Sequence, residues 1–266
     1  MSEPDLPRLA AFAATLADSA RAAILPYFRA APAVTDKGAG VFDPVTEADS
    51  AAEQAMRALI SAHFPEHGVL GEEFAETPSQ SPYQWIIDPI DGTRAFIAGL
   101  PTWGVLIALA YEGRPILGIM DQPYIDERFA GYDYAGQRAA ALTARGQTRA
   151  LKTRACARLG DAILCTTDPY LFHGAEADAF ARARGAAKLT RYGYDCYAYS
   201  MIAAGGVDCV IESGLKAFDI AALIPILSAA GGGVCDWQGA PAPKGGQVLA
   251  YGDPRVRDAA LKALAG

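Results

Sequence analysis

The chain has 266 residues, 52% of them hydrophobic, and a formal net charge of −7. This length and composition allow a large buried core, as one big domain or as two lobes, and the acidic balance argues against a nucleic-acid-binding protein. The longest apolar runs fall short of the roughly 18 to 20 residues that span a bilayer, and no basic segment leads into an apolar one at the N-terminus, so we predict a cytoplasmic protein with no membrane contact.

Two amphipathic helices are predicted in the first quarter of the chain. Apolar residues recur at helical spacing from Asp5 to Phe28, and a second helix opens near Thr46 and runs to about Ala62. Thr46 and Asp49 both have the spacing of an N-cap for this helix. Capping is therefore the structural alternative to any chemical role for Asp49.

Strand patterns follow, first in hairpins and then in alternation with helices. The turns Glu112-Gly113-Arg114 and Tyr134-Ala135-Gly136 separate strand-like runs. Up to residue 150 the predicted strands are 85–87, 102–111, 116–120 and 128–134. Beyond it, strands 162–166, 188–191, 207–211, 233–237 and 248–251 alternate with helices 175–184, 196–204 and 220–230 and a terminal helix from residue 253. We predict an N-terminal α+β lobe (1–145) and a C-terminal α/β lobe (146–266).

The segment Asp88-Pro89-Ile90-Asp91-Gly92-Thr93 places two carboxylates and a hydroxyl in a turn directly after an apolar strand. Carboxylates this close repel each other unless one is protonated or a cation lies between them, and hard oxygen ligands suit Mg²⁺. Glu72, Asp49 and Asp219 also stand where predicted elements begin or end. Each alone is weak evidence, because an Asp before a helix is most often a cap and a Glu pair after a strand is most often solvated. Together they predict a divalent metal site.

Three motifs resemble the signatures of the inositol monophosphatase family in order and spacing. They are Gly71-Glu72-Glu73, the run 85–93 and Phe218-Asp219-Ile220-Ala221-Ala222. The resemblance covers nearly the whole chain and implies an α/β (α+β) fold, a layered αβαβα sandwich of the inositol monophosphatase and fructose bisphosphatase type. It also implies a Mg²⁺-dependent, lithium-sensitive phosphomonoesterase that forms homodimers. Phe218 departs from the Trp that is common in this family but keeps an aromatic side chain.

The resemblance also assigns roles in metal binding and catalysis. It places two or three Mg²⁺ ions in the site, with Asp88 bridging two of them. The implied metal ligands are Glu72, Asp88, the backbone carbonyl of Ile90, Asp91 and Asp219. The implied catalytic residues around the attacking water are Asp49, Thr93 and Glu72. Because a threonine hydroxyl is a weak base, we interpret Thr93 as a relay that passes a proton toward Asp49.

A second segment, from Arg191 to Asp195, is expected to contact the leaving group. Where inositol-cleaving relatives resemble Gly-Thr-Ala, this chain has Gly193-Tyr194-Asp195, and Glu212 adds another carboxylate. Two carboxylates favour a cationic alcohol over a neutral polyol, and the segment looks like the histidinol-phosphate phosphatase branch of the family. An N-cap is the alternative role for Asp195. The predicted substrate-binding residues are Gly92, Thr93, Arg94, Arg191, Gly193, Tyr194, Asp195 and Glu212.

The sequence thus predicts a histidinol-phosphatase that acts on a small phosphorylated metabolite in histidine biosynthesis. One alternative is an inositol-1-phosphate or broad sugar-phosphate phosphatase, and another is a non-catalytic member of the fold that binds phosphorylated ligands. The glycine-containing loop around Lys37 either closes over the site or is an ordinary solvated loop.

Overall fold

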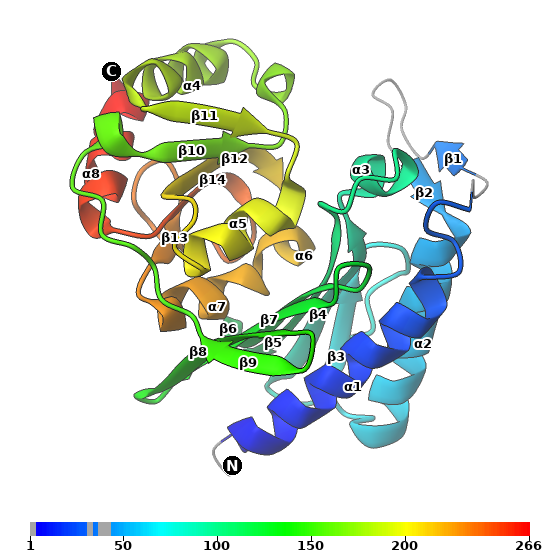
Figure 1. Cartoon of the computed structure of the whole chain (residues 1–266). Helices are drawn as coiled ribbons and strands as arrows, with labels where there is room; N and C mark the ends of the chain where they lie inside the picture. Colours follow the sequence, from blue (N-terminus) through cyan, green and yellow to red (C-terminus); the bar gives the residue numbers. More distant parts are fainter. Residues whose placement is uncertain (1–3, 31–33, 37–43) are drawn as a thin grey trace.

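A computed structural model of the chain describes residues 4–30, 34–36 and 44–266 (Figure 1). The predicted Lys37 loop lies outside these residues. Within the described ranges, no helix combines the length and the apolar character that crossing a membrane requires. The predicted homodimer and the cytoplasmic location stay predictions.

The elements in chain order match most of the expected pattern. The helices are α1 (Leu6–Ile24), α2 (Glu47–His63), α3 (Thr93–Ile97), α4 (Ala175–Ala186), α5 (Asp195–Ala203), α6 (Ala217–Ile220), α7 (Leu223–Ala230) and α8 (Pro254–Ala265), with 3₁₀ turns η1 (Leu159–Asp161) and η2 (Pro169–Leu171). The strands are β1 (Val34–Asp36), β2 (Pro44–Thr46), β3 (Gly68–Gly71), β4 (Tyr83–Asp91), β5 (Gly104–Tyr111), β6 (Arg114–Gln122), β7 (Glu127–Tyr134), β8 (Gln137–Ala144), β9 (Gln147–Ala150), β10 (Ile163–Thr166), β11 (Leu189–Tyr192), β12 (Cys209–Leu215), β13 (Gly233–Cys235) and β14 (Gly246–Tyr251).

Two sheets organise the chain besides the short β1–β2 pair. The large sheet has seven strands in the order β3-β4-β5-β6-β7-β8-β9, antiparallel except for the β3–β4 pair. The small sheet has the order β11-β10-β12-β14-β13, with parallel pairing on one side of β12 and antiparallel pairing on the other. The predicted boundary at residues 145 and 146 falls in the turn between β8 and β9, and the division into two lobes stays a prediction.

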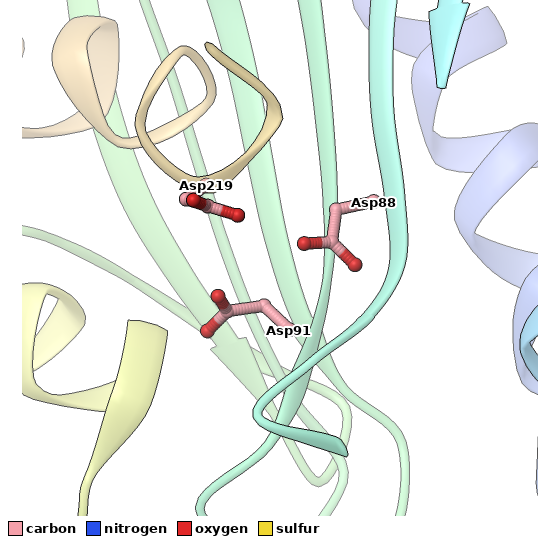
Figure 2. Close-up of side chains that lie close together, drawn as sticks. All are labelled: Asp88, Asp91 and Asp219. Carbon is pink, nitrogen blue, oxygen red and sulfur yellow. The ribbon is translucent and has the colours of Figure 1, made fainter. Parts of the chain in front are cut away.

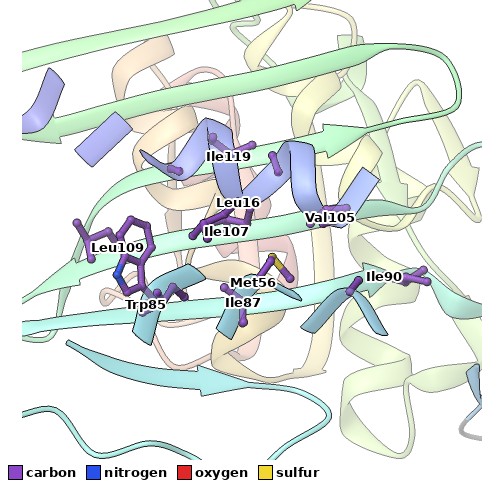
Figure 3. Packing of buried hydrophobic residues seen from close by; sticks show 14 of the residues in the cluster. Leu16, Met56, Trp85, Ile87, Ile90, Val105, Ile107, Leu109 and Ile119 are labelled. Carbon is purple, nitrogen blue, oxygen red and sulfur yellow. The ribbon is translucent and has the colours of Figure 1, made fainter. Parts of the chain in front are cut away.

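Helices cover the outer face of each sheet and also lie between the two sheets, which confirms the predicted αβαβα layering (Figure 1). One buried cluster joins α1 and α2 to the large sheet, a second joins that sheet to the small sheet through α5, α6 and α7, and a third lies between the small sheet and α4 and α8. Alternation along β4 shows how the layers separate: Trp85 and Ile87 face α1 and α2, whereas Ile86 faces the middle helices. Figure 3 shows the outer cluster, in which Leu16 and Met56 lie over the strands.

The structure corrects three details of the predicted elements. The helix expected over 220–230 is broken into α6 and α7, because Pro225 has no backbone N–H and is accommodated in the first turn of a new helix. Helix α1 ends at Ile24 rather than at Phe28, since Pro26 cannot continue it. The sequence reading also lacked β8 and β9, whose alanine-rich and short sequences have weak strand signals.

Candidate active site

A bulge at the end of β4 brings Asp88 and Asp91 to the same face of the large sheet. Asp88 pairs with Leu106 and Asp91 with Gly104, so β4 has one residue more than β5 between these pairs. In a regular strand, residues three apart point to opposite faces, and one extra residue reverses that relation. Ile90 accordingly packs in the outer cluster, and both carboxylates are directed toward the middle helices.

Asp219 approaches the same space from α6. Figure 2 shows the three carboxylates turned toward one another, with Asp88 and Asp91 on the strand side and Asp219 on the helix side. One oxygen from each lies within 4.8 Å of the others. Asp219 also accepts the Lys216 N–H at 2.6 Å, which fixes the carboxylate at the first turn of α6.

Burial and mutual repulsion raise the pKa values of Asp88 and Asp91 in this cluster. Burial raises the pKa of Asp88 well above its usual range, and the negative charges of Glu72, Asp91 and Asp219 raise it further. Burial also raises the pKa of Asp91, with Asp195 and Asp219 adding to the effect, and raises that of Asp219 to about 6. A crowded set of carboxylate oxygens fits a divalent cation, which would offset their mutual repulsion.

Glu72 lies beside this cluster at the end of β3. Gly71 pairs with Ile87 in the parallel β3–β4 ladder, so the next residue on β3 is level with Asp88. The Glu72 carboxyl lies close enough to Asp88 to raise the pKa of that residue. The structure therefore brings together the side chains of all four predicted carboxylate ligands, Glu72, Asp88, Asp91 and Asp219.

Asp49 is the N3 residue of a capping box and is also fully buried. Its Oδ2 accepts the Thr46 N–H at 2.8 Å and the Thr46 hydroxyl at 2.6 Å, so the predicted capping role is confirmed. Its Oδ1 is buried without a hydrogen-bond partner among the described residues, and burial raises the pKa of Asp49 to about 6. One oxygen of this carboxylate thus remains for another role.

Thr93 begins α3, directly after Gly92 in a left-handed conformation (φ 87°). Its hydroxyl donates to the Ile90 carbonyl at 3.1 Å and forms no hydrogen bond to Asp49 in the part of the chain described. The structure therefore shows no direct Thr93–Asp49 relay, and the catalytic roles of both residues stay predictions.

A cavity of about 270 Å³ adjoins the cluster and is lined by residues from the sides of both sheets. Asp91, Gly92, Thr93 and Arg94 line it from the large-sheet side, and Asp195, Glu212 and Asp219 line it from the small-sheet side. Five of the eight predicted substrate-binding residues therefore share one space with two of the carboxylates of the cluster.

Two threonines hold Glu212 at this cavity. Its carboxylate accepts the Thr166 hydroxyl at 3.1 Å and the Thr167 N–H at 2.5 Å. Burial raises the pKa of Glu212 to about 7, although these hydrogen bonds oppose the shift. Neither threonine was among the predicted site residues, and their position at the end of β10 was the only available signal.

Asp195 adopts an unusual backbone conformation at the start of α5. Its φ of 44° is left-handed, and its carboxylate lies so close to Gly92 that a Cβ there would be 2.9 Å from Oδ2. Tyr194, not Asp195, occupies the N-cap position, so the predicted capping alternative is wrong. Burial raises the pKa of Asp195 to about 6, and the positive charge of Arg94 opposes the shift.

Three other predicted substrate-binding residues lie outside the lining of this cavity. Arg191 is exposed and donates to the Tyr194 hydroxyl at 2.9 Å, and the Gly193 carbonyl accepts the Thr102 hydroxyl at 3.2 Å. Tyr199, on α5, was not among the predicted site residues. Its hydroxyl is fully buried without a partner among the described residues, and the charges of Glu212, Asp91 and Asp219 help burial to raise its pKa.

Comparisons with known proteins give the context of this site. The sequence model of the inositol monophosphatase family matches residues 5–265. The bifunctional phosphatase IMPL2 of Arabidopsis thaliana is 40% identical over 275 aligned residues, which cover 99% of this chain and 77% of that protein. A histidinol-phosphatase of Chlorobaculum parvum is 38% identical over an alignment that covers 74% of this chain and 73% of that protein. An inositol monophosphatase structure from Zymomonas mobilis superposes with a TM-score of 0.86 at 39% identity, covering 99% of this chain and all of that one.

Proposed function

The chain belongs to the inositol monophosphatase family and is therefore a phosphatase, and from this premise we propose that it hydrolyses L-histidinol phosphate to L-histidinol and phosphate. The single observation that supports this substrate is the pair of carboxylates, half-buried Asp195 and buried Glu212, in the cavity beside the aspartate cluster. A neutral polyol gives these charges no counterion, whereas the ammonium group of histidinol does.

The family is metal-dependent, and the donor set fits Mg²⁺ because it consists of carboxylate oxygens and one backbone carbonyl. We propose that Glu72, Asp88 and the Ile90 carbonyl hold one ion, and that Asp88, Asp91 and Asp219 hold a second. Bound Mg²⁺ would neutralise phosphoryl oxygens and lower the pKa of a water.

The remaining groups would place the phosphate and handle the proton. Gly92 and Thr93 line the cavity, where their backbone N–H groups would bind phosphate oxygens. The free Oδ1 of Asp49 is suited to accept a proton, since burial has already raised its pKa. Thr93 would orient the water while its hydroxyl remains bonded to Ile90.

Arg94 would balance the charge of the leaving-group pocket. It lines the cavity and its positive charge acts on Asp195, so it can hold that carboxylate in its ionised form. The ammonium of the substrate would then meet Asp195 and Glu212 while the phosphate remains at Gly92. Arg191, Gly193 and Tyr194 would act only if the substrate extended beyond the cavity.

A second candidate is an inositol or sugar phosphatase. It is favoured by the Zymomonas mobilis structure, which is named an inositol monophosphatase and is 39% identical to this chain. The two candidates differ in whether the carboxylates at Asp195 and Glu212 discriminate between leaving groups.

The test compares kcat/KM with Mg²⁺ for L-histidinol phosphate and myo-inositol 1-phosphate in the wild type and Asp195→Asn. Asparagine keeps the size of the side chain and tolerates the left-handed backbone. We expect a preference for histidinol phosphate that falls about 30-fold in the variant, the equivalent of about 2 kcal/mol. Equal or reversed preference in the wild type would refute the histidinol assignment, and silence toward both esters and a generic monoester would favour a non-catalytic ligand-binding protein.

A further inference from the structure

The buried carboxylate of Glu53, on α2, binds the loop that follows Glu72. Glu53 has no exposed surface. Its Oε2 accepts the Glu73 N–H at 2.8 Å, and its Oε1 accepts the Phe74 N–H at 3.2 Å. Two successive backbone donors of this loop are thus held by one side chain.

Arg57, one helical turn later on α2, binds both Glu53 and the same loop. Its Nε donates to Glu53 Oε1 at 2.8 Å, and its other nitrogens donate to the Phe74 carbonyl at 3.1 Å and the Thr77 hydroxyl at 3.2 Å. The pair therefore satisfies both donors and an acceptor of the loop and fixes it to α2.

The contact reaches the other side of Glu72 as well. A Cβ at Gly71 would lie 2.0 Å from Glu53 Oε1, so this carboxylate occupies the space that any larger residue would need. Glu53 therefore touches both neighbours of Glu72, Gly71 before it and Glu73 after it. The backbone of Glu72 has little freedom to move away from Asp88.

The face of α2 that carries Glu53 also carries Asp49, a residue of the candidate site. Asp49 and Glu53 are four residues apart and therefore adjacent on one face of α2. Asp49 lies near the Glu73 carboxylate, whose charge contributes to its raised pKa. Helix α2 thus orients Asp49 directly and Glu72 through Glu53.

We propose that Glu53 is a positioning residue that fixes Glu72 for metal binding and keeps it in register with Asp49. This inference rests on the proposed function, in which Glu72 is a metal ligand. An ion pair that served helix stability alone would not need to be buried, since exposed pairs four residues apart on a helix stabilise it without desolvation.

Glu53→Gln tests the proposal because it keeps the volume but removes the charge and one acceptor. Residues that orient metal ligands typically change metal affinity by about 10 to 100-fold. We expect the half-saturating Mg²⁺ concentration to rise at least about tenfold, measured both by phosphate release and by the Mg²⁺-induced rise in Tm. The value of kcat at saturating Mg²⁺ should fall by less than about threefold, since the ligand itself remains.

Asp208→Asn is the matched control. Asp208 is also buried, pairs with Arg154 and accepts the Ile163 N–H at 2.7 Å, but it belongs to the small sheet. It should lower the metal-free Tm as Glu53→Gln does, while its half-saturating Mg²⁺ concentration matches the wild type.

The outcomes separate this inference from the proposed function. If the wild type shows no Mg²⁺-dependent turnover or Tm shift, the metal site itself fails. If the wild type responds and Glu53→Gln has the same half-saturating Mg²⁺ concentration as Asp208→Asn, the positioning role is refuted. Should Glu53→Gln not fold, Arg57→Lys serves instead, because it keeps the charge beside Glu53 but cannot retain all the loop contacts, and an unchanged Mg²⁺ requirement there overturns the proposal.

Discussion

Gly118→Ala should disturb the site although it adds only one methyl group, at a residue that does not line the cavity. Gly118 lies on β6, and a Cβ there would be 1.9 Å from the Ala222 carbonyl oxygen. Strand β6 is paired on both sides, with Ala108 and Gly131 opposite Gly118. The strand is therefore held in place, and the link between α6 and α7 must move.

The size of that movement follows from the contact. Reaching an ordinary van der Waals distance requires a shift of about 1.5 Å. Asp219 stands three residues before Ala222 in the same segment, so its carboxylate would leave the present cluster. Overpacking of this kind costs about 1 to 3 kcal/mol, and a misplacement of about 1 Å at a reacting centre costs about 100-fold in rate.

The assay pairs thermal unfolding with phosphate release at saturating Mg²⁺. We expect Gly118→Ala to lower Tm by about 6 °C and kcat by about 100-fold. Gly131→Ala is the control, because its Cβ would meet Ile226 at 2.8 Å, one turn farther from Asp219. It should lower Tm but leave kcat within about threefold. A Gly118→Ala protein with a lowered Tm and wild-type kcat would show that the reasoning about Asp219 is wrong.

Three further predictions concern charges in other places. Asp91→Asn should abolish Mg²⁺-dependent turnover yet raise the metal-free Tm, because it removes one of several buried negative charges; a lowered metal-free Tm would contradict this. Asp121 is fully buried between Arg21 and Arg128, with nitrogen–oxygen distances of 2.6 and 2.7 Å, so Asp121→Asn should cost about 3 kcal/mol in urea unfolding. Burial lowers the pKa of His67 to about 4; the unfolded chain therefore binds a proton more readily between about pH 6.5 and 4. Stability should fall by about 1 kcal/mol as the pH drops through that window, after a discount for partial exposure, and His67→Gln should remove this loss.

The elements that the sequence predicted well are those whose local signals agree with their packing. Strand β4 alternates Trp85 and Ile87 against Ile86, and the turn at Glu112-Gly113-Arg114 forms the β5–β6 connection as expected. The broken helix at 220–230 was also readable in principle, since Pro225 cannot lie in the interior of a longer helix. The apolar periodicity continues through Pro225, so a prediction based on periodicity alone gave one unbroken helix.

In the candidate site too, the sequence located some residues and missed another. Motif spacing located Glu72, Asp88, Asp91 and Asp219, because each stands at or near the end of an element and these ends meet in the fold. It missed Glu53, which in sequence reads as an ordinary helix-surface partner of Arg57. Its burial depends on a loop that is twenty or more positions away, and such long-range contacts leave no local pattern.

The bulge in β4 makes the number of residues in that strand as decisive as their identity. A relative that lost a single residue between Asp88 and Asp91 would still have every aspartate, yet its second carboxylate would face α1 and α2 instead of the middle helices. Point substitutions could not restore the lost geometry. Gain and loss of this chemistry among distant relatives should therefore follow insertions and deletions at one position, and a sequence comparison that ignores gaps there would overlook it.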